Sequence, residues 1–327
     1  MNARMDDTLL QVDDLQVHFP RPGKGLFGRP EVVKAVDGVS FSLRRGSTLA
    51  VVGESGSGKT TTALAVMRLA PITGGEIALD GTPISRIEGE ELRRARPRFQ
   101  MVFQDPFSSL NPRDRVGRII RQPMDLLGLG EPSGRDARVE ELLTQVGLRP
   151  ELKSLYPHQF SGGQRQRIGL ARALATKPDL IVFDEPVSAL DVAVQAQVLN
   201  LIRRLQRETG LTYLFISHDL GVVRHICDEI AVMYLGQIVE KAPAAQIFAA
   251  PRHPYTQALI AAAPSLAPEH RRRGGGARLQ GDPPSPVNLP KGCRFASRCP
   301  IAVEDCRQRM PALRQLAPGQ AVACHLA

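Results

Sequence analysis

A glycine-rich segment with one lysine directly follows an apolar run. Residues 53–60 read Gly-Glu-Ser-Gly-Ser-Gly-Lys-Thr, and residues 49–52 before them read Leu-Ala-Val-Val. Glycines let the backbone curl so that successive N–H groups point at phosphate oxygens. Lys59 can reach the β- and γ-phosphates, the Thr60 hydroxyl can bind Mg²⁺, and a following helix directs its positive end at the same anion. The pattern predicts a nucleoside triphosphate site lined by Gly53, Glu54, Ser55, Gly56, Ser57, Gly58, Lys59, Thr60 and Thr61.

Two acidic residues end a second apolar run. Leu180–Phe183 are followed by Asp184 and Glu185. A buried strand would carry this pair to its carboxyl end, where ligands lie in open α/β sheets. Asp184 is suited to organise Mg²⁺, largely through the water shell of the ion. Glu185 is suited to orient and polarise an attacking water molecule, so the bound triphosphate is expected to be hydrolysed.

A second anion cradle is expected 23 residues before Asp184. Residues 160–167 read Phe-Ser-Gly-Gly-Gln-Arg-Gln-Arg. The Ser161 hydroxyl and the N–H groups of Gly162 and Gly163, at the start of a helix, could bind an anion. One chain needs only one such cradle around its own triphosphate. The second cradle therefore suggests that two chains each lend one to the other's nucleotide.

These segments, in this order, resemble the ATP-binding cassette (ABC) family of transporter ATPases over residues of about 8–265. Residues 53–60 match the Walker A motif of the family, and residues 184–185 match Walker B with its catalytic glutamate. Residues 160–164 match the signature motif, with Phe160 where Leu is usual, a departure that should leave the cradle intact. Residues 188–191, Ser-Ala-Leu-Asp, match the D-loop.

The resemblance also implies roles for single residues. Gln104 matches the glutamine that ligates Mg²⁺ and senses the membrane partner, and His218 matches the switch histidine that touches the γ-phosphate. Phe19 is the candidate for the aromatic that stacks on adenine, with Phe27 second and a core role for Phe19 as the alternative. The catalytic residues are then Glu185, His218 and Gln104, and the Mg²⁺ ligands are Thr60, Gln104 and Asp184. The remaining ATP contacts are Phe19, Ser161, Gly162, Gly163, Gln164 and Asp191.

Strand-like and helix-like segments alternate along the chain. Strands are expected at residues 8–20, 74–81, 180–183 and 212–216, a strand pair at 32–43, and helices at 58–69 and 193–208. Residues of about 106–159 have apolar positions at helical spacing and form the expected helical subdomain. This order predicts an α/β fold. The family resemblance makes it an ABC-type P-loop ATPase with a mixed sheet core, an antiparallel β subdomain and a helical insert. We expect a nucleotide-binding domain at 8–265, a Pro/Gly/Arg-rich linker at 266–290 and a Cys-rich tail at 291–327.

Composition excludes some classes of protein. A net charge of +9 is compatible with a nucleic-acid partner. However, Trp is absent, and the basic residues do not alternate with the aromatic residues on which bases would stack. We therefore expect no nucleic-acid partner. No run of 18 apolar residues exists. The first ten residues lack the apolar core of a secretory signal. The expected location is the cytoplasmic face of the inner (cell) membrane, as a peripheral protein.

Partners follow from the resemblance. In the family, two ATPase subunits form a head-to-tail dimer that ATP closes and hydrolysis reopens, and the motion passes to transmembrane subunits. Residues 33–41, 104–113 and 253–259 are similar to the oligopeptide and dipeptide importer branch, and the insert after Phe19 favours the second of its two ATPase types. We expect a heterodimer with a second ABC ATPase subunit, two permease subunits and, indirectly, an extracytoplasmic substrate-binding protein.

Three other classes of function remain open. Importers of nickel and of glutathione share these features. A soluble ATPase clamp acting on DNA or ribosomes shares the cassette, but usually fuses two cassettes or carries long coiled-coil or zinc inserts. A cassette can also serve as a non-transport scaffold of a soluble enzyme complex.

Four of the five cysteines lie in the tail, at Cys293, Cys299, Cys306 and Cys324. Disulfides are not expected in a cytosolic protein, and the C-x-x-C pairs typical of zinc sites are absent. Cys299-Pro300 is similar to the Cys-Pro of ferredoxin-type ligands, and similar tails in peptide-importer ATPases are associated with a [4Fe-4S] cluster. We expect these four thiolates to hold a [4Fe-4S] cluster that folds a tail too short to build its own core, with Zn²⁺ or unligated thiols as alternatives.

Overall fold

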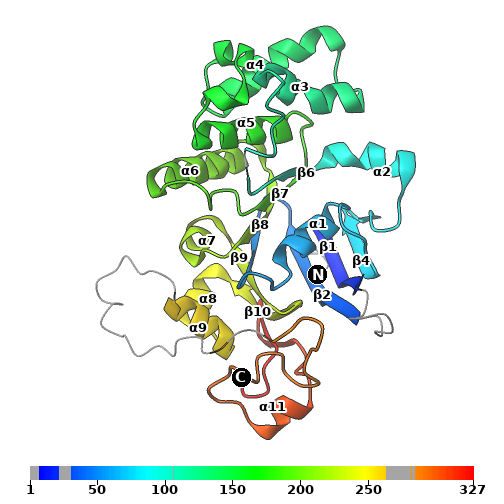
Figure 1. The fold of residues 1–327 in the computed structure, drawn as a ribbon, viewed down its shortest axis with the longest axis vertical. Coiled ribbons are helices and arrows are strands. Elements are labelled where there is room, and N and C mark those ends of the chain that lie inside the picture. Colours follow the sequence, from blue (N-terminus) through cyan, green and yellow to red (C-terminus); the bar gives the residue numbers. More distant parts are fainter. Residues whose placement is uncertain (1–6, 22–30, 106, 263–280, 282–283) are drawn as a thin grey trace, which may run out of the picture. The chain divides into compact units, whose positions relative to one another are not determined.

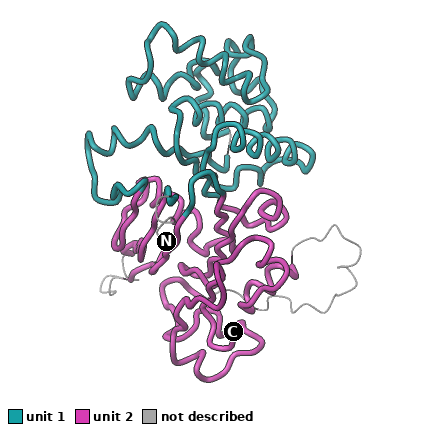
Figure 2. The backbone as a smooth tube through the Cα atoms, turned by 180° about the vertical axis from the view of Figure 1, so that it is seen from behind, with its two compact units in different colours: residues 1–9, 43–47, 79–215 teal, residues 10–42, 48–78, 216–327 magenta. Residues whose placement is uncertain are grey.

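The computed structural model describes residues 7–21, 31–105, 107–262, 281 and 284–327. Two compact units divide the chain (Figure 2). Unit 1 consists of residues 1–9, 43–47 and 79–215. Unit 2 consists of residues 10–42, 48–78 and 216–327. Each unit is thus assembled from segments that lie far apart in the sequence.

Unit 1 combines a few strands with most of the longer helices (Figure 1). Its strands are β5 (Thr82–Pro83), β6 (Phe99–Val102), β7 (Leu180–Asp184) and β8 (Thr212–Ser217), whose last two residues belong to unit 2. Its helices are α2 (Gly89–Ala95), α3 (Val116–Leu127), α4 (Arg135–Gln145), α5 (Gly162–Leu174) and α6 (Val192–Thr209). Short 3₁₀ turns lie at Arg96–Arg98, Pro132–Gly134, Pro150–Ser154 and Pro157–Gln159.

The core of unit 1 follows from its apolar patterns. Strands β8, β7 and β6 are neighbours in that order, and β6 pairs with β7 in parallel, with Phe99 opposite Leu180. A strand covered on both faces reads as a continuous apolar run, and all five residues of β7 are buried. Helix α3 packs against α4 and α5, and it buries Val116, Ile119, Ile120 and Met124, which share one helical face.

Unit 2 holds the remaining strands and helices (Figure 1). Apart from a few end residues, its strands are β1 (Thr8–Arg21), β2 (Glu31–Arg44), β3 (Thr48–Val52), β4 (Gly74–Leu79), β9 (Glu229–Tyr234), β10 (Gln237–Pro243), β11 (Arg314–Ala317) and β12 (Gln320–Val322). Its helices include α1 (Lys59–Val66), α7 (Leu220–Ile226), α8 (Ala244–Ala249), α9 (Pro254–Ala262) and α11 (Glu304–Gln308).

Two strand sets organise unit 2. Strands β2, β1 and β4 are neighbours in one sheet, and β11, β12, β10, β9 and β3 are neighbours, in that order, in the other. Strand β3 pairs in parallel with β9, whereas β9, β10, β12 and β11 pair antiparallel in succession. The sheet is therefore mixed, as predicted.

The C-terminal segment joins the second sheet of unit 2 instead of forming a separate module. Strand β12 pairs with β10, with Val322 opposite Glu240. Phe295 is 1% exposed, and its ring centroid lies 5.4 Å from those of both Tyr234 and Tyr255. The segment therefore shares the core of unit 2 and needs no core of its own.

Most of the expected elements are present. The strands at 8–20, 74–81, 180–183 and 212–216 correspond to β1, β4, β7 and β8, and the helices at 58–69 and 193–208 correspond to α1 and α6. The predicted strand pair at 32–43 is wrong: it is the single strand β2, whose apolar pattern is broken at Gly38, where φ is +84°. The domain boundaries stay predictions, and most of the expected linker lies outside the described residues. Within the described ranges, no helix is both long and apolar enough to span a bilayer.

Candidate functional site

The phosphate loop, residues 53–60, follows β3 and ends in α1. All five residues of β3 are buried, so the loop begins at a fixed point. A Cβ atom at Gly53 would lie 2.2 Å from the Met233 carbonyl oxygen, and one at Gly58, where φ is +104°, would lie 2.2 Å from the Ala35 carbonyl oxygen. Backbone atoms cannot move aside easily, so these two positions accept only glycine.

Polar groups of this loop are arranged to receive an anion. Lys59 is 5% exposed, and its ammonium donates hydrogen bonds of 2.8 Å to the carbonyl oxygens of Gly53 and Glu54. The Ser57 hydroxyl is buried and has no hydrogen-bond partner among the described residues. A buried hydroxyl without a partner is costly, and a phosphate oxygen would satisfy it. The loop therefore fits the triphosphate that the sequence predicts.

In unit 1, the structure brings Gln104 and Glu185 together. Gln104 follows β6 and Glu185 follows β7, and parallel neighbouring strands end at the same edge of a sheet. Gln104 Nε2 donates a 3.0 Å hydrogen bond to Glu185 Oε2. Glu185 has a φ of +47°, which is rare for a residue with a side chain and is often found at functional sites. Asp184 precedes it at the end of β7 and is 5% exposed.

The signature segment begins α5 in unit 1. Ser161 is the N-cap: its Oγ accepts from the Gln164 N–H at 3.4 Å, and Gln164 Oε1 accepts from the Ser161 N–H at 3.0 Å. A Cβ at Gly163 would lie 2.3 Å from Val194 Cγ1 in α6, so this glycine permits close packing of the two helices. Ser161 is exposed, as a group that serves another molecule must be.

The other predicted residues lie at ends of elements. Asp191 is the N-cap of α6 and accepts a 3.0 Å hydrogen bond from the Val194 N–H. His218 directly follows β8 and is exposed. Phe19 lies in β1 and is 37% exposed, so its ring is not part of the core. Phe27 lies outside the described residues. The structure thus gathers Phe19, the phosphate loop and His218 in unit 2, and Gln104, Asp184, Glu185, the signature segment and Asp191 in unit 1.

The cysteine prediction requires a correction. Among the described residues, no three or more His, Cys, Asp or Glu side chains are grouped to hold a metal ion. The [4Fe-4S] cluster expected on Cys293, Cys299, Cys306 and Cys324 is therefore wrong, and the zinc alternative is not supported either. All five cysteines are free thiols.

The cysteines contribute to packing instead. Cys306 and Cys324 are buried, and Cys293 and Cys299 pack against the core of unit 2. Burial raises the pKa of Cys293 to about 11 and also raises the pKa of Cys299, which favours the protonated thiol over the thiolate that binds metals. Spacing along the chain misled the prediction because it does not say where side chains point.

Two arginines of the tail contact the phosphate loop and its surroundings, and sequence reasoning missed them. Arg298 donates to both carboxylate oxygens of Glu54, at 2.7 and 3.0 Å. Arg294 donates to the Asp37 carboxylate and to the Leu235 carbonyl oxygen. Their side chains are only 4% and 5% exposed. The only signal in the sequence was two arginines beside the cysteines and Phe295, and it gave no partner for either.

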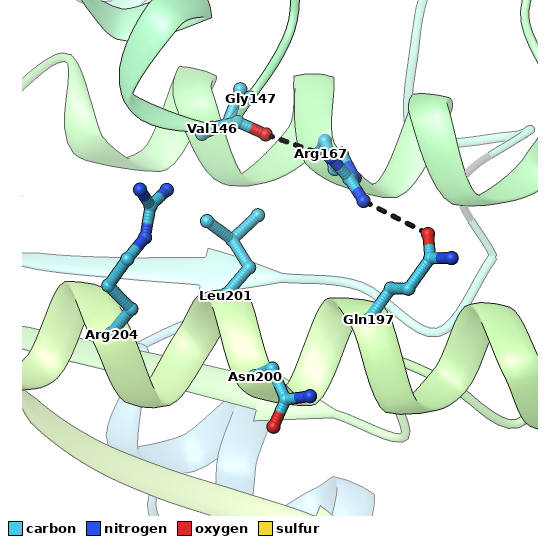
Figure 3. Close-up of a pocket in the computed structure, with 7 residues that line it drawn as sticks. All are labelled: Val146, Gly147, Arg167, Gln197, Asn200, Leu201 and Arg204. Carbon is cyan, nitrogen blue, oxygen red and sulfur yellow. Dashed lines mark hydrogen bonds between the residues drawn. The ribbon is translucent and has the colours of Figure 1, made fainter.

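A separate cavity of about 340 Å³ lies in unit 1 (Figure 3). Arg167 donates to the Val146 carbonyl oxygen at 3.4 Å and to Gln197 Oε1 at 3.3 Å, and Arg204 donates to the Gln145 carbonyl oxygen at 2.7 Å. Both guanidinium groups therefore already have acceptors, and none of the predicted site residues lines this cavity.

Two family models match the chain. Residues 36–188 match "ABC transporter", and residues 239–306 match "Oligopeptide/dipeptide transporter, C-terminal region". The chain is 51% identical to the oligopeptide transport ATP-binding protein AppF of Bacillus subtilis, over 100% of this chain and 99% of that protein. It is 52% identical to the probable peptide ABC transporter ATP-binding protein y4tS of Sinorhizobium fredii, over 98% and 91%.

Solved structures agree with these matches. The dimeric ATP-binding cassette MJ0796 bound to ADP and Pi has a TM-score of 0.63 and 26% identity, covering 72% of this chain and 99% of that one. The cbiO1 protein of Clostridium perfringens, part of the cbiONQ transporter complex, has a TM-score of 0.64 and 26% identity, covering 75% and 92%. The predicted fold class is confirmed. The chain belongs to the ABC transporter family, as one of its ATP-binding, ATP-hydrolysing proteins.

Proposed function

We propose that this chain hydrolyses ATP to drive a membrane importer of di- or oligopeptides. The observation that carries the proposal is the phosphate loop, in which two positions exclude any side chain and a buried lysine lies over the loop carbonyls. The cargo assignment is supported by the peptide-transport names of AppF and y4tS and by the match of residues 239–306.

ATP binding would engage the phosphate loop. Lys59 exchanges its bonds to the Gly53 and Glu54 carbonyls for bonds to phosphate oxygens. The Ser57 hydroxyl, which has no partner within the described part of the chain, gains one. Phe19 stacks on the adenine, supported by its exposed ring. The residues that would hold Mg²⁺ are Thr60, Gln104 and Asp184. The ion would neutralise charge on the phosphates.

Hydrolysis would depend on Glu185, which orients the attacking water. The hydrogen bond from Gln104 orients the Glu185 carboxylate, and Gln104 would also be one of the residues that hold Mg²⁺. His218 contacts the γ-phosphate. The positive φ of Glu185 supports this assignment, because it is uncommon for a residue with a side chain and is often found at functional sites.

The partner of this chain would be a second ABC ATPase subunit, with which it forms a heterodimer. Exposed Ser161, at the start of α5, completes the partner's nucleotide site together with Gly162, Gly163, Gln164 and Asp191. Two permease subunits receive the motion, and an extracytoplasmic binding protein supplies the cargo. The chain works as a peripheral protein on the cytoplasmic face of the cell membrane.

An uptake experiment tests the cargo. Cells lacking the gene for this chain are given labelled di- and tetrapeptides, nickel ions or glutathione, with and without a plasmid that restores the chain. We expect only peptide uptake to depend on the chain. If the plasmid restores uptake of nickel or glutathione alone, the cargo is nickel or glutathione and not a peptide. If uptake of peptides, nickel and glutathione is the same with and without the plasmid, the proposal is refuted.

A further inference from the structure

Glu54, the second residue of the phosphate loop, is held at three points within unit 2. Its N–H donates a 2.8 Å hydrogen bond to the Tyr255 hydroxyl of α9. Its carbonyl oxygen accepts from Lys59 at 2.8 Å. Its carboxylate accepts both hydrogen bonds from Arg298 of the C-terminal tail. Two of these three points of contact, with Tyr255 and with Arg298, come from elements outside the loop.

The Arg298 side chain is itself fixed in place. It is 4% exposed, and its guanidinium lies 5.9 Å from the ring centroids of both Tyr234 and Phe295. Arg298 also donates a 3.4 Å hydrogen bond to the Tyr234 hydroxyl. The hydrogen bond to Glu54 raises the pKa of Arg298, against the effect of burial. A two-bonded arginine–carboxylate pair sets orientation as well as distance, which a lysine could not do.

The tail around Arg298 is anchored to the rest of unit 2 independently of Glu54. The Arg298 N–H donates to the Phe295 carbonyl oxygen at 3.0 Å, which closes a turn. Phe295 packs on Tyr234 and Tyr255, and Arg294 binds Asp37 and the Leu235 carbonyl oxygen. These contacts fix the position of the tail, so the Arg298 guanidinium lies beside Glu54 on a rigid part of unit 2.

We propose that Arg298 is a positioning residue for ATP: through Glu54 it holds the phosphate loop in the shape that receives the phosphates. The inference rests on the proposed role of that loop. A glycine-rich loop has many alternative conformations, and ordering it in advance removes part of the entropy that nucleotide binding would otherwise lose. The tail thus acts on the nucleotide without contact to it.

The role predicts a specific kinetic signature. Losing the contact makes the loop less ordered, so the KM and the Kd for ATP rise while kcat at saturating ATP stays within about twofold. Substituting the outer-shell partners of metal ligands typically costs about 10–100-fold in affinity or activity, and by analogy we expect about tenfold here. A purely structural role would instead lower the melting temperature and the active fraction, which reduces kcat and leaves the Kd of the folded chain unchanged.

The experiment measures ATP binding by titration calorimetry, and ATPase rates, on the full chain. The variants are Arg298→Ala, Arg298→Lys, Glu54→Gln and the double variant Arg298→Ala/Glu54→Gln. We expect Kd to rise about tenfold in Arg298→Ala and Glu54→Gln, less in Arg298→Lys, and no further in the double variant, because both changes remove one interaction. Arg309→Ala is the matched control, since Arg309 forms an exposed ion pair with Asp305 in the same tail.

The outcomes separate the two proposals. A Kd within twofold of the wild-type value in folded Arg298→Ala, or additive effects in the double variant, overturns the inference. If Arg298→Ala does not fold, Glu54→Gln decides in the same way, because its side chain is 28% exposed and its loss leaves the tail core intact. Lys59→Ala tests the proposed function: an unchanged Kd there refutes the loop as the ATP site, whatever the tail variants show.

Discussion

Acidification should destabilise unit 2 through one buried histidine, His253. The side chain is 1% exposed, and its Nδ1 accepts a 3.0 Å hydrogen bond from the Tyr255 N–H. Burial lowers the pKa of His253 from 6.5 to about 4. Protonation would bury a charge and would remove the acceptor of the Tyr255 N–H, so the folded chain resists it.

The sign and size of the effect follow from linkage. Between pH 6.5 and 4 the unfolded chain binds a proton at His253 that the folded chain does not bind, so the free energy of unfolding falls as the pH falls. The difference between a pKa of 6.5 in the unfolded chain and about 4 in the folded chain corresponds to about 3 kcal/mol, of which about 2.5 kcal/mol is lost at about pH 4.5. Stability from this group is fully present above pH 6.5.

Urea unfolding followed by far-ultraviolet circular dichroism measures this effect, since the chain has no Trp. Wild type and His253→Gln are compared from about pH 7.5 to 4.5. The variant lacks the titrating ring, so the difference between the two free energies should shrink by about 2.5 kcal/mol across this range. His158→Gln, which makes the same substitution at an exposed histidine, is the matched control. Parallel curves for wild type and His253→Gln would refute the assignment.

Three substitutions test the proposed site. Glu185→Gln should keep ATP binding and lower phosphate release at least about 100-fold, and unchanged turnover would remove Glu185 from the mechanism. Ser161→Arg should leave the ATP affinity of the single chain unchanged but abolish the ATP-dependent dimer seen by light scattering; a persisting dimer would contradict the shared-site proposal. Gly58→Ala should destabilise the chain by about 2 kcal/mol and eliminate ATP binding, because the added Cβ meets the Ala35 carbonyl oxygen at 2.2 Å; wild-type binding would show that the loop adapts.

Sites formed by a short contiguous segment could be predicted from the sequence, because the residues that give the segment its shape lie within the segment itself. The phosphate loop needs glycines where a Cβ would meet backbone atoms, and those glycines lie within a few residues of Lys59. The pairing of Gln104 with Glu185, 81 positions apart, was not predicted, although two parallel strands that end at one edge of the sheet account for it. The contact between Glu54 and Arg298 joins residues 244 positions apart, and no local pattern encodes it. The same limit explains the wrong metal assignment, since cysteine spacing carries no information about convergence in space.

The support of the phosphate loop explains why the C-terminal segment matters to an ATPase. The Tyr255 hydroxyl accepts a hydrogen bond from the Glu54 N–H. The Tyr255 backbone N–H donates to His253 Nδ1, and the His253 backbone N–H donates to the Glu240 carboxylate in β10. Strand β12 of the tail pairs with this same β10 at Glu240. Arg298 of the C-terminal tail binds the Glu54 carboxylate directly. Residues after β10 thus support the loop through two separate routes, and they act as part of the nucleotide site although none of them belongs to a nucleotide-binding motif.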